Sequence, residues 1–112
     1  MPNYAAQLDG VFRALGDPTR RAVLGRLSRG PAAVSELARP FDMALPSFTQ
    51  HLAVLENCGL VGSRKTGRVR TFQLVPQPLE AAERWMVEQR ALWERRLDQL
   101  DNYLKDLKER EL

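Results

Sequence analysis

The chain has 112 residues, of which 44% are apolar and 28% charged, and it carries a formal net charge of +3. This length and composition fit one folded domain and exclude a disordered chain, and no run approaches the roughly 18 apolar residues of a membrane span, so we expect no membrane partner. The N-terminus lacks the pattern of a signal peptide and the single cysteine cannot form an internal disulfide, so we expect a cytoplasmic protein.

The charge is unevenly distributed along the chain. Residues 1–75 carry ten Lys and Arg against five Asp and Glu, whereas residues 76–112 carry seven against nine. A basic body with an acidic tail favours a polyanion as the partner of the body and a different task for the tail. An ordinary solvated surface is the alternative interpretation.

Two helices are predicted at the start of the chain. Apolar residues at helical spacing indicate the first, from Tyr4 to Leu15. The second has Asp17 as its N-cap, Pro18 at its first helical position and Gly30 as its stop.

The next segment predicts two short helices joined by a tight turn. Ser35 is the expected N-cap of the first helix, which should end near Arg39 because Pro40 disfavours helical geometry in the residue before it. The second helix covers residues 46–57. Together, residues 35–57 have the pattern of a helix-turn-helix.

The periodicity then changes from helical to alternating. Residues 60–75 contain two alternating runs around the pair Thr66-Gly67, which predicts a β-hairpin. From Leu79 to about Glu109 there is no glycine or proline, so we predict a last helix roughly 45 Å long. The expected fold is therefore mainly helical with one small hairpin, and its last helix is too long to be buried by its own domain.

Helix 46–57 has one apolar and one polar face. Phe48, Leu52 and Leu55 share the apolar face at 100° per residue. The side chains on the exposed side and its flanks are small and polar, and those that suit base edges are Ser47, Thr49 and Gln50. Gln can pair bidentately with adenine. An ordinary amphipathic surface helix is the alternative.

The hairpin carries cations and no acid. The four candidates for phosphate contacts are Arg64, Lys65, Arg68 and Arg70. Phosphate contacts from such a hairpin would add affinity with little sequence information and would weaken with salt. A charged edge strand that prevents aggregation is the alternative.

The chain's only histidine and only cysteine do not form a reactive pair. His51 and Cys58 are seven residues apart, roughly 10 Å along a helix, which is too far for a shared metal or a nucleophile–base pair. His51 suits partial burial or a phosphate contact, and Cys58 suits packing. We therefore expect no enzyme activity, no metal site and no cofactor.

The last helix carries an apolar stripe close to a heptad seam, which Arg90 interrupts. Its members from Met86 onward are Met86, Trp93, Leu97, Leu100, Leu104 and Leu107, and the first five are the candidates for the dimer interface. A single helix cannot bury such a stripe, so it should pair with a second copy of itself, with the first helix, or with both. Packing against its own domain is the alternative.

Four motifs in order carry a family resemblance. The segments "ALGDPTRRAVLGRL", "VSELA", "LPSFTQHLAVLENCGLV" and "GRVRTFQL" resemble the ArsR/SmtB family of small dimeric bacterial transcriptional repressors. The resemblance covers roughly residues 10–75. It is greatest to the branch without metal ligands, because "SELARPF" lacks cysteines and no histidine follows residue 51.

The resemblance implies a winged helix-turn-helix homodimer without a metal. Residues 46–57 would be the recognition helix in the major groove, and residues 60–75 the wing. Ser47, Thr49, Gln50 and His51 match the family's DNA-facing positions. Residues 1–16 and 78–109 would form the dimer interface, with Leu8 and Phe12 contributed by the first helix.

The main hypothesis is a single-domain, sequence-specific DNA-binding homodimer, 1–112, which represses transcription at a near-palindromic operator. It would be released by an unidentified small-molecule or redox inducer. Two alternatives stay open: a protein-interaction module that uses the long last helix, and a redox-responsive regulator that uses Cys58.

Overall fold

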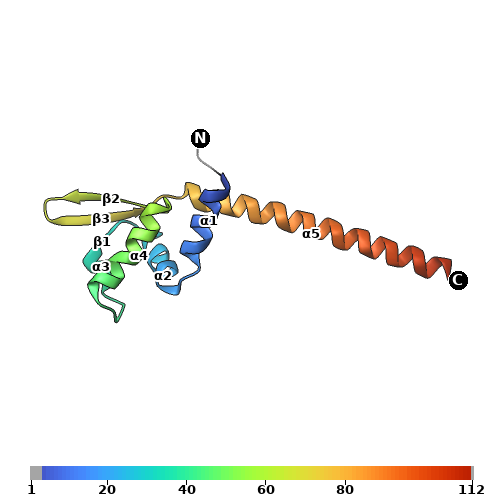
Figure 1. The fold of residues 1–112 in the computed structure, drawn as a ribbon, viewed down its shortest axis with the longest axis horizontal. Helices are drawn as coiled ribbons and strands as arrows, with labels where there is room; N and C mark the ends of the chain where they lie inside the picture. The colour runs from blue at the N-terminus through green and yellow to red at the C-terminus, as the bar shows by residue number, and fades with distance from the viewer. Residues whose placement is uncertain (1–3, 112) are drawn as a thin grey trace. The chain divides into compact units, whose positions relative to one another are not determined.

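The computed structural model describes residues 4–111, so the predictions for residues 1–3 and 112 lie outside the described residues. The elements in chain order are α1 (Tyr4–Leu15), α2 (Pro18–Leu27), β1 (Ala32–Ala33), α3 (Val34–Ala38), α4 (Leu45–Asn57), β2 (Val61–Thr66), β3 (Val69–Leu74) and α5 (Gln77–Arg110) (Figure 1). The chain divides into two compact units, one up to Ala82 and one from Glu83 onward. Each is described by itself below.

The start of α2 is capped as the sequence predicts. The Asp17 carboxylate accepts a hydrogen bond from the Arg20 backbone N–H at 3.0 Å, and Pro18 occupies the first helical position. The helix ends at Leu27, and the chain turns at Gly30, whose φ of 136° lies outside the range that other residues readily adopt.

The start of α3 differs from the prediction. The N-cap residue is Ala33 rather than Ser35, and the Ala33 N–H donates to the Glu36 carboxylate at 3.4 Å. The reason is a short strand that the sequence did not reveal: Ala32 pairs with Phe72 and Ala33 with Thr71. Because Ala33 is held extended in this strand, the helix begins directly after it, and Ser35 lies inside the helix.

The sheet is antiparallel with strand order β1-β3-β2. The two-residue turn of the hairpin is Gly67-Arg68, one position later than predicted, because Thr66 still pairs with Val69. Gly67 has a φ of 63°, whereas no described residue other than a glycine, and therefore not Arg68, has a positive φ. A positive φ at the first of the two turn residues alone is what a type II′ turn requires. Figure 1 shows the hairpin extending away from the helices that pack at its base.

The core of the first unit is built around α4. Phe48, Leu52 and Leu55 are buried, and the Phe48 ring stacks on Phe41 with centroids 5.4 Å apart. The other buried apolar residues come from every remaining element: Leu8, Val11, Ala14, Val23, Leu24, Leu27, Ala32, Leu37, Leu60, Val61, Phe72 and Ala82. Leu8 was expected at the dimer interface. With 8% of its surface exposed, it is a core residue of its own chain.

The second unit is the remainder of α5 (Gln77–Arg110). Residues 83–111 include no buried side chain, and their apolar residues are largely exposed, for example Trp93 at 67% and Leu97 at 60%. A helix with this much exposed apolar surface is a candidate for association with another helix.

Candidate nucleic-acid interface

α4 presents a polar surface opposite the residues that fix it in the core. Ser47, Thr49 and Gln50 are exposed, as the sequence predicts. The Thr49 hydroxyl donates to the Pro46 carbonyl at 3.0 Å, so it offers only its oxygen lone pairs to a ligand. Ser47 and Gln50 therefore have the freest hydrogen-bonding groups on this face.

The N-terminus of α4 has no side-chain cap. Ala44 occupies the N-cap position without a polar side-chain atom, and Pro46 has no N–H. The backbone N–H groups of Leu45 and Ser47 consequently lie at the positive end of the helix dipole without a side-chain acceptor. Such an end favours an anion such as a phosphate.

His51 lies at the edge of this surface and contacts α2. Its Nδ1 is 3.2 Å from Arg20 Nη1 and 3.8 Å from an Asp17 carboxylate oxygen, and 24% of its side chain is exposed. Because the Arg20 guanidinium only donates, this contact is a hydrogen bond when His51 Nδ1 carries no proton. The DNA contact predicted for His51 stays a prediction, and Nε2 is the ring nitrogen outside these two contacts.

Arg20 connects three elements. Its Nε donates to the Ala14 carbonyl at 2.8 Å and its Nη2 to the Arg13 carbonyl at 3.0 Å, both in the last turn of α1. Its Nη1 reaches His51 in α4. The side chain therefore satisfies helix-terminal carbonyls and ties α4 to α1. Sequence reasoning missed this role because Arg20 and His51 are far apart in the chain.

The same cluster changes the acidity of Asp17. The pKa of its carboxyl is lowered from the usual 3.8, chiefly because the Arg20 backbone N–H donates to the charged form. Burial, the second-largest influence, acts in the opposite direction, and smaller lowering effects come from the positive charges of His51, when protonated, and of Arg20, and from the Thr19 backbone N–H.

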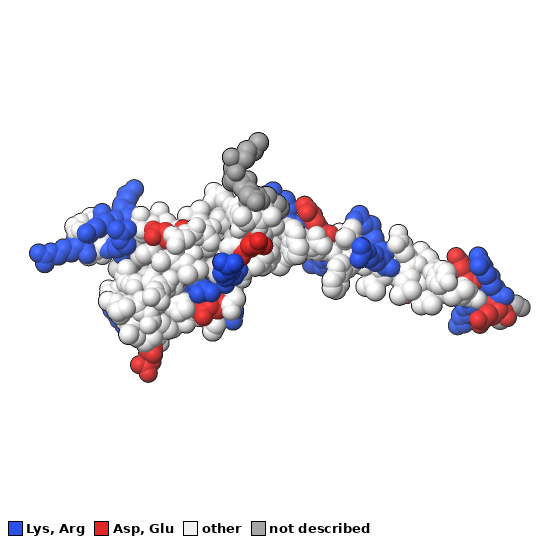
Figure 2. Space-filling model, in the orientation of Figure 1, with Lys and Arg blue, Asp and Glu red and all other residues white. Residues whose placement is uncertain are grey.

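The predicted cations of the hairpin surround its outer half. The register pairs Lys65 with Arg70 and Arg64 with Thr71, which places Lys65 and Arg70 on one face of the hairpin and Arg64 on the other. Arg68 lies in the turn, and all four side chains are exposed. Figure 2 shows this basic cluster gathered over the outer part of the hairpin. It presents positive charge on both faces of the hairpin and at its turn.

Arg70 also has a structural partner. Its Nη1 donates to the Ser63 hydroxyl at 2.8 Å, and that hydroxyl donates to the Glu56 carboxylate at the end of α4. This chain of hydrogen bonds ties the hairpin to α4. The other three cations of the hairpin have no hydrogen-bonded side-chain partner among the described residues; they are Arg64, Lys65 and Arg68.

No three His, Cys, Asp or Glu side chains of residues 4–111 lie close enough together to hold a metal ion. No helix in the same range is long and apolar enough to cross a membrane.

The candidates for the dimer interface differ in exposure. Phe12 in α1 is partly exposed, and the candidates on α5 are about half exposed or more: Met86, Trp93, Leu97, Leu100 and Leu104. Leu107, which also belongs to the predicted stripe, is exposed as well, and so are Val87 and Tyr103, which the predicted heptad seam did not include.

An uncapped polar helix beside a cationic two-stranded hairpin, both held on one helical core, defines a winged helix-turn-helix protein. A family model described as "Helix-turn-helix domain" matches residues 15–64. The chain is 47% identical over 73 residues to the HTH-type transcriptional regulator Rv2034 of Mycobacterium tuberculosis, which covers 65% of this chain and 68% of that one. It is 29% identical to the transcriptional repressor SdpR of Bacillus subtilis, over 71% of this chain and 89% of SdpR.

Solved structures agree with these relatives. The crystal structure of the ArsR family transcriptional regulator RHA00566 is 61% identical and has a TM-score of 0.79, covering 84% of this chain and 97% of its own. The homodimeric winged helix-turn-helix DNA-binding domain of Mb0332 from Mycobacterium bovis is 25% identical with a TM-score of 0.61, covering 81% and 82%.

The chain belongs to the ArsR family of transcriptional regulators, which confirms the family and the fold class predicted from the sequence. It is a DNA-binding regulator of transcription. These relatives do not favour the protein-interaction module or the Cys58 regulator as alternatives. The Cys58 thiol is half-buried and donates to the Leu55 carbonyl at 3.3 Å.

Proposed function

We propose that the chain is a homodimeric repressor that binds a near-palindromic operator through α4 and the wing. The observation that carries this proposal is the exposed polar face of α4 together with the basic cluster of the hairpin, which is tied to α4 through Ser63 and Glu56. The name of the relative SdpR supports repression rather than activation, and the homodimeric domain of Mb0332 supports a dimer.

In this proposal α4 reads the bases. Gln50 lies on the exposed face with its amide free, and a Gln amide matches the donor and acceptor of adenine N6 and N7. Ser47 and the uncapped helix end contact a phosphate or a base edge near the groove wall. Thr49 contributes an acceptor or its methyl group.

The wing supplies contacts to the phosphate backbone. Arg64, Lys65 and Arg68 are exposed and lack a carboxylate partner among the described residues, so neutralising DNA phosphates breaks no internal ion pair. Such contacts add affinity that does not depend on sequence and that decreases as salt increases. Arg70 supports the wing through Ser63 in addition to any contact of its own.

The apolar stripe of α5 forms the dimer. A second copy of the chain offers the same stripe, and pairing the two buries side chains such as Trp93 and Leu97 that are otherwise in water. Dimerisation presents two recognition helices to successive major grooves, about 34–36 Å apart. This spacing is the reason to expect a near-palindromic operator.

The DNA ligand implies that the repressor acts in the cytoplasm. A metal inducer is disfavoured because "SELARPF" contains no cysteine and no histidine follows His51. We therefore propose that the releasing signal is not a metal ion.

The experiment is a gel shift of the full chain on the DNA upstream of its own gene and on random DNA of the same length. Gln50→Ala should weaken binding to the upstream DNA by roughly tenfold to a hundredfold and leave binding to random DNA nearly unchanged. Gln99→Ala, an exposed glutamine on α5, is the matched control and should change neither. No shift of upstream DNA at low salt would contradict the proposed function, and equal weakening on both DNAs would remove Gln50 from base reading.

A further inference from the structure

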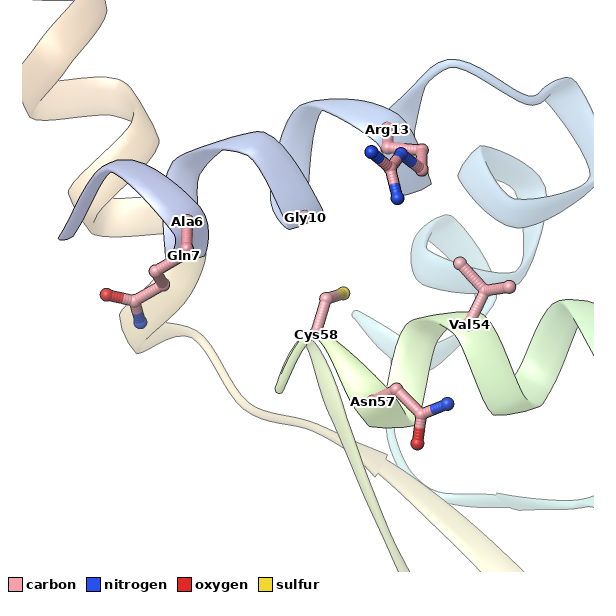
Figure 3. A pocket seen from close by; sticks show the side chains of 7 residues that line it. All are labelled: Ala6, Gln7, Gly10, Arg13, Val54, Asn57 and Cys58. Carbon is pink, nitrogen blue, oxygen red and sulfur yellow. The ribbon is translucent and has the colours of Figure 1, made fainter. Parts of the chain in front are cut away.

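A cavity of about 580 Å³ lies between α1 and the C-terminal end of α4 and opens to solvent, with Gln7, Arg13 and Asn57 among its exposed lining residues (Figure 3). Its wall on the α1 side consists of Ala6, Gln7, Gly10 and Arg13, and its wall on the α4 side of Val54, Asn57 and Cys58. This volume is within the range of sites for small molecules. The interface to DNA described above does not use any of these residues.

The lining carries one positive charge and no negative charge. Arg13 takes part in no ion pair among residues 4–111, and Figure 3 shows its guanidinium directed toward the α4 side of the cavity. The amides of Gln7 and Asn57 stand at the rim and can donate hydrogen bonds, while Ala6 and Val54 provide apolar surface. A compact apolar body that carries one carboxylate matches this combination of groups.

The two walls belong to helices with different tasks in the proposed function. α4 reads DNA, and α1 belongs to the proposed dimerisation region. Arg20 holds the Arg13 and Ala14 carbonyls of α1 to His51 of α4. The α4 wall of the cavity therefore begins about 4.5 Å beyond this tie, at Val54, and ends roughly 10 Å beyond it, at Cys58. At the cavity, by contrast, a helical Gly10 lets α1 approach α4: a Cβ on Gly10 would lie 3.4 Å from the Cys58 Cβ.

We propose that this cavity binds a small organic monocarboxylate, with Arg13 as the residue that pairs with the carboxylate, and that this ligand is the inducer that releases DNA. The proposal rests on the proposed function for its regulatory half. A ligand between the two walls moves the end of α4 relative to α1, while Arg20 holds the other part of α4 in place. The two recognition helices of a dimer then lose their matched spacing, and operator affinity decreases.

Benzoate is the probe, because it is a flat apolar ring with one carboxylate, and benzyl alcohol is its uncharged counterpart. Backbone amide NMR shifts of the full chain, recorded without DNA, report binding and its location. We expect benzoate to shift the amides of the lining residues and to bind at least about tenfold more tightly than benzyl alcohol, as a charge-assisted hydrogen bond implies.

Arg13→Gln tests the charge, and Arg29→Gln is its matched control. Arg29 is an exposed arginine of the same unit that does not line this cavity. Arg13→Gln should remove the preference for benzoate over benzyl alcohol and should leave operator binding without ligand unchanged. Arg29→Gln should keep the preference. An unchanged preference in Arg13→Gln, or shifts confined to residues outside the lining, would overturn the proposed site.

Gel shifts in the presence of benzoate test the regulatory half. We expect benzoate to weaken operator binding of the wild type severalfold and to have no effect on Arg13→Gln. Benzoate that shifts the lining amides but leaves operator affinity unchanged would overturn the role as inducer. Failure of the proposed function and failure of the proposed site are distinguishable. Loss of DNA binding in every condition would contradict the proposed function. The ligand site is tested separately, because the amide shifts are measured without DNA.

Discussion

Replacing Arg20 with methionine tests whether this side chain holds α1, α2 and α4 together. Methionine keeps much of the aliphatic stem and removes three hydrogen bonds, to the Ala14 carbonyl, the Arg13 carbonyl and His51 Nδ1. A net value of about 1 kcal/mol for each bond, reduced because the group is only partly buried, gives an expected loss of about 2–3 kcal/mol in the free energy of unfolding.

The neighbouring arginine supplies the control. Arg21 is exposed and makes one hydrogen bond, from its Nη1 to the Leu15 carbonyl at 2.7 Å, so Arg21→Met should lose only about 0.5 kcal/mol. Both variants are unfolded in urea and followed by circular dichroism at one fixed protomer concentration, since a dimer gains stability with concentration. Equal losses in the two variants would refute the reasoning that Arg20 connects the three helices.

Three further predictions concern the wing, the dimer and the acid limit of stability. Arg64→Ala combined with Arg68→Ala should weaken binding to operator and random DNA alike and reduce the slope of log affinity against log salt by about two; an unchanged slope would remove both residues from the phosphate contacts. Leu97→Glu should raise the dimer dissociation constant more than about tenfold, measured by analytical ultracentrifugation, because it places a charge in the apolar stripe. Gln99→Glu is the control and should not raise it. A dimer that survives Leu97→Glu would contradict pairing through the stripe. The pKa of Asp17 is lower in the folded state, so its contribution to stability is complete above the usual value of 3.8 and is lost as the pH falls through the lower folded value. Asp17→Asn keeps the cap and should lack this part of the acid loss in urea titrations between pH 5 and pH 2; the same acid loss in the variant would show that Asp17 contributes none of it.

The parts of the fold that the sequence predicts correctly depend on local chemistry. Asp17 followed by Pro18 identifies a helix start because the cap and the fixed proline φ act within one turn. The exposure of Ser47 and Gln50 follows from the 100° rotation per residue that buries Phe48. These features need no information about distant residues.

The parts that it does not predict depend on pairs far apart in the chain. Strand β1 has only two residues, and it exists because Ala32 and Ala33 pair with β3, about forty residues later. That pairing moved the N-cap of α3 away from Ser35, which has the better capping side chain. In the hairpin, Thr66 continues the strand because its pairing with Val69 leaves the positive φ to Gly67.

The candidate site shows the same division. The exposed arginines of the hairpin were visible from charge alone, but the contact of His51 with Arg20 and Asp17 was not, because it joins residues of two helices. The link from Arg70 through Ser63 to Glu56 was equally hidden, since it requires the register of β2 against β3 and the end of α4.

In the proposed function, these hidden contacts link the parts of the DNA-binding surface. α4 is held by Arg20 at His51 and by the wing at Glu56, so its two ties lie about one and a half turns apart and on different elements. A displacement of the end of α4 at Cys58 would therefore be carried through Glu56 and Ser63 into the wing, while Arg20 holds the part of α4 around His51. Because phosphate contacts fix the register in which bases are read, a displaced wing would weaken the base contacts of Gln50 together with the phosphate contacts of Arg68.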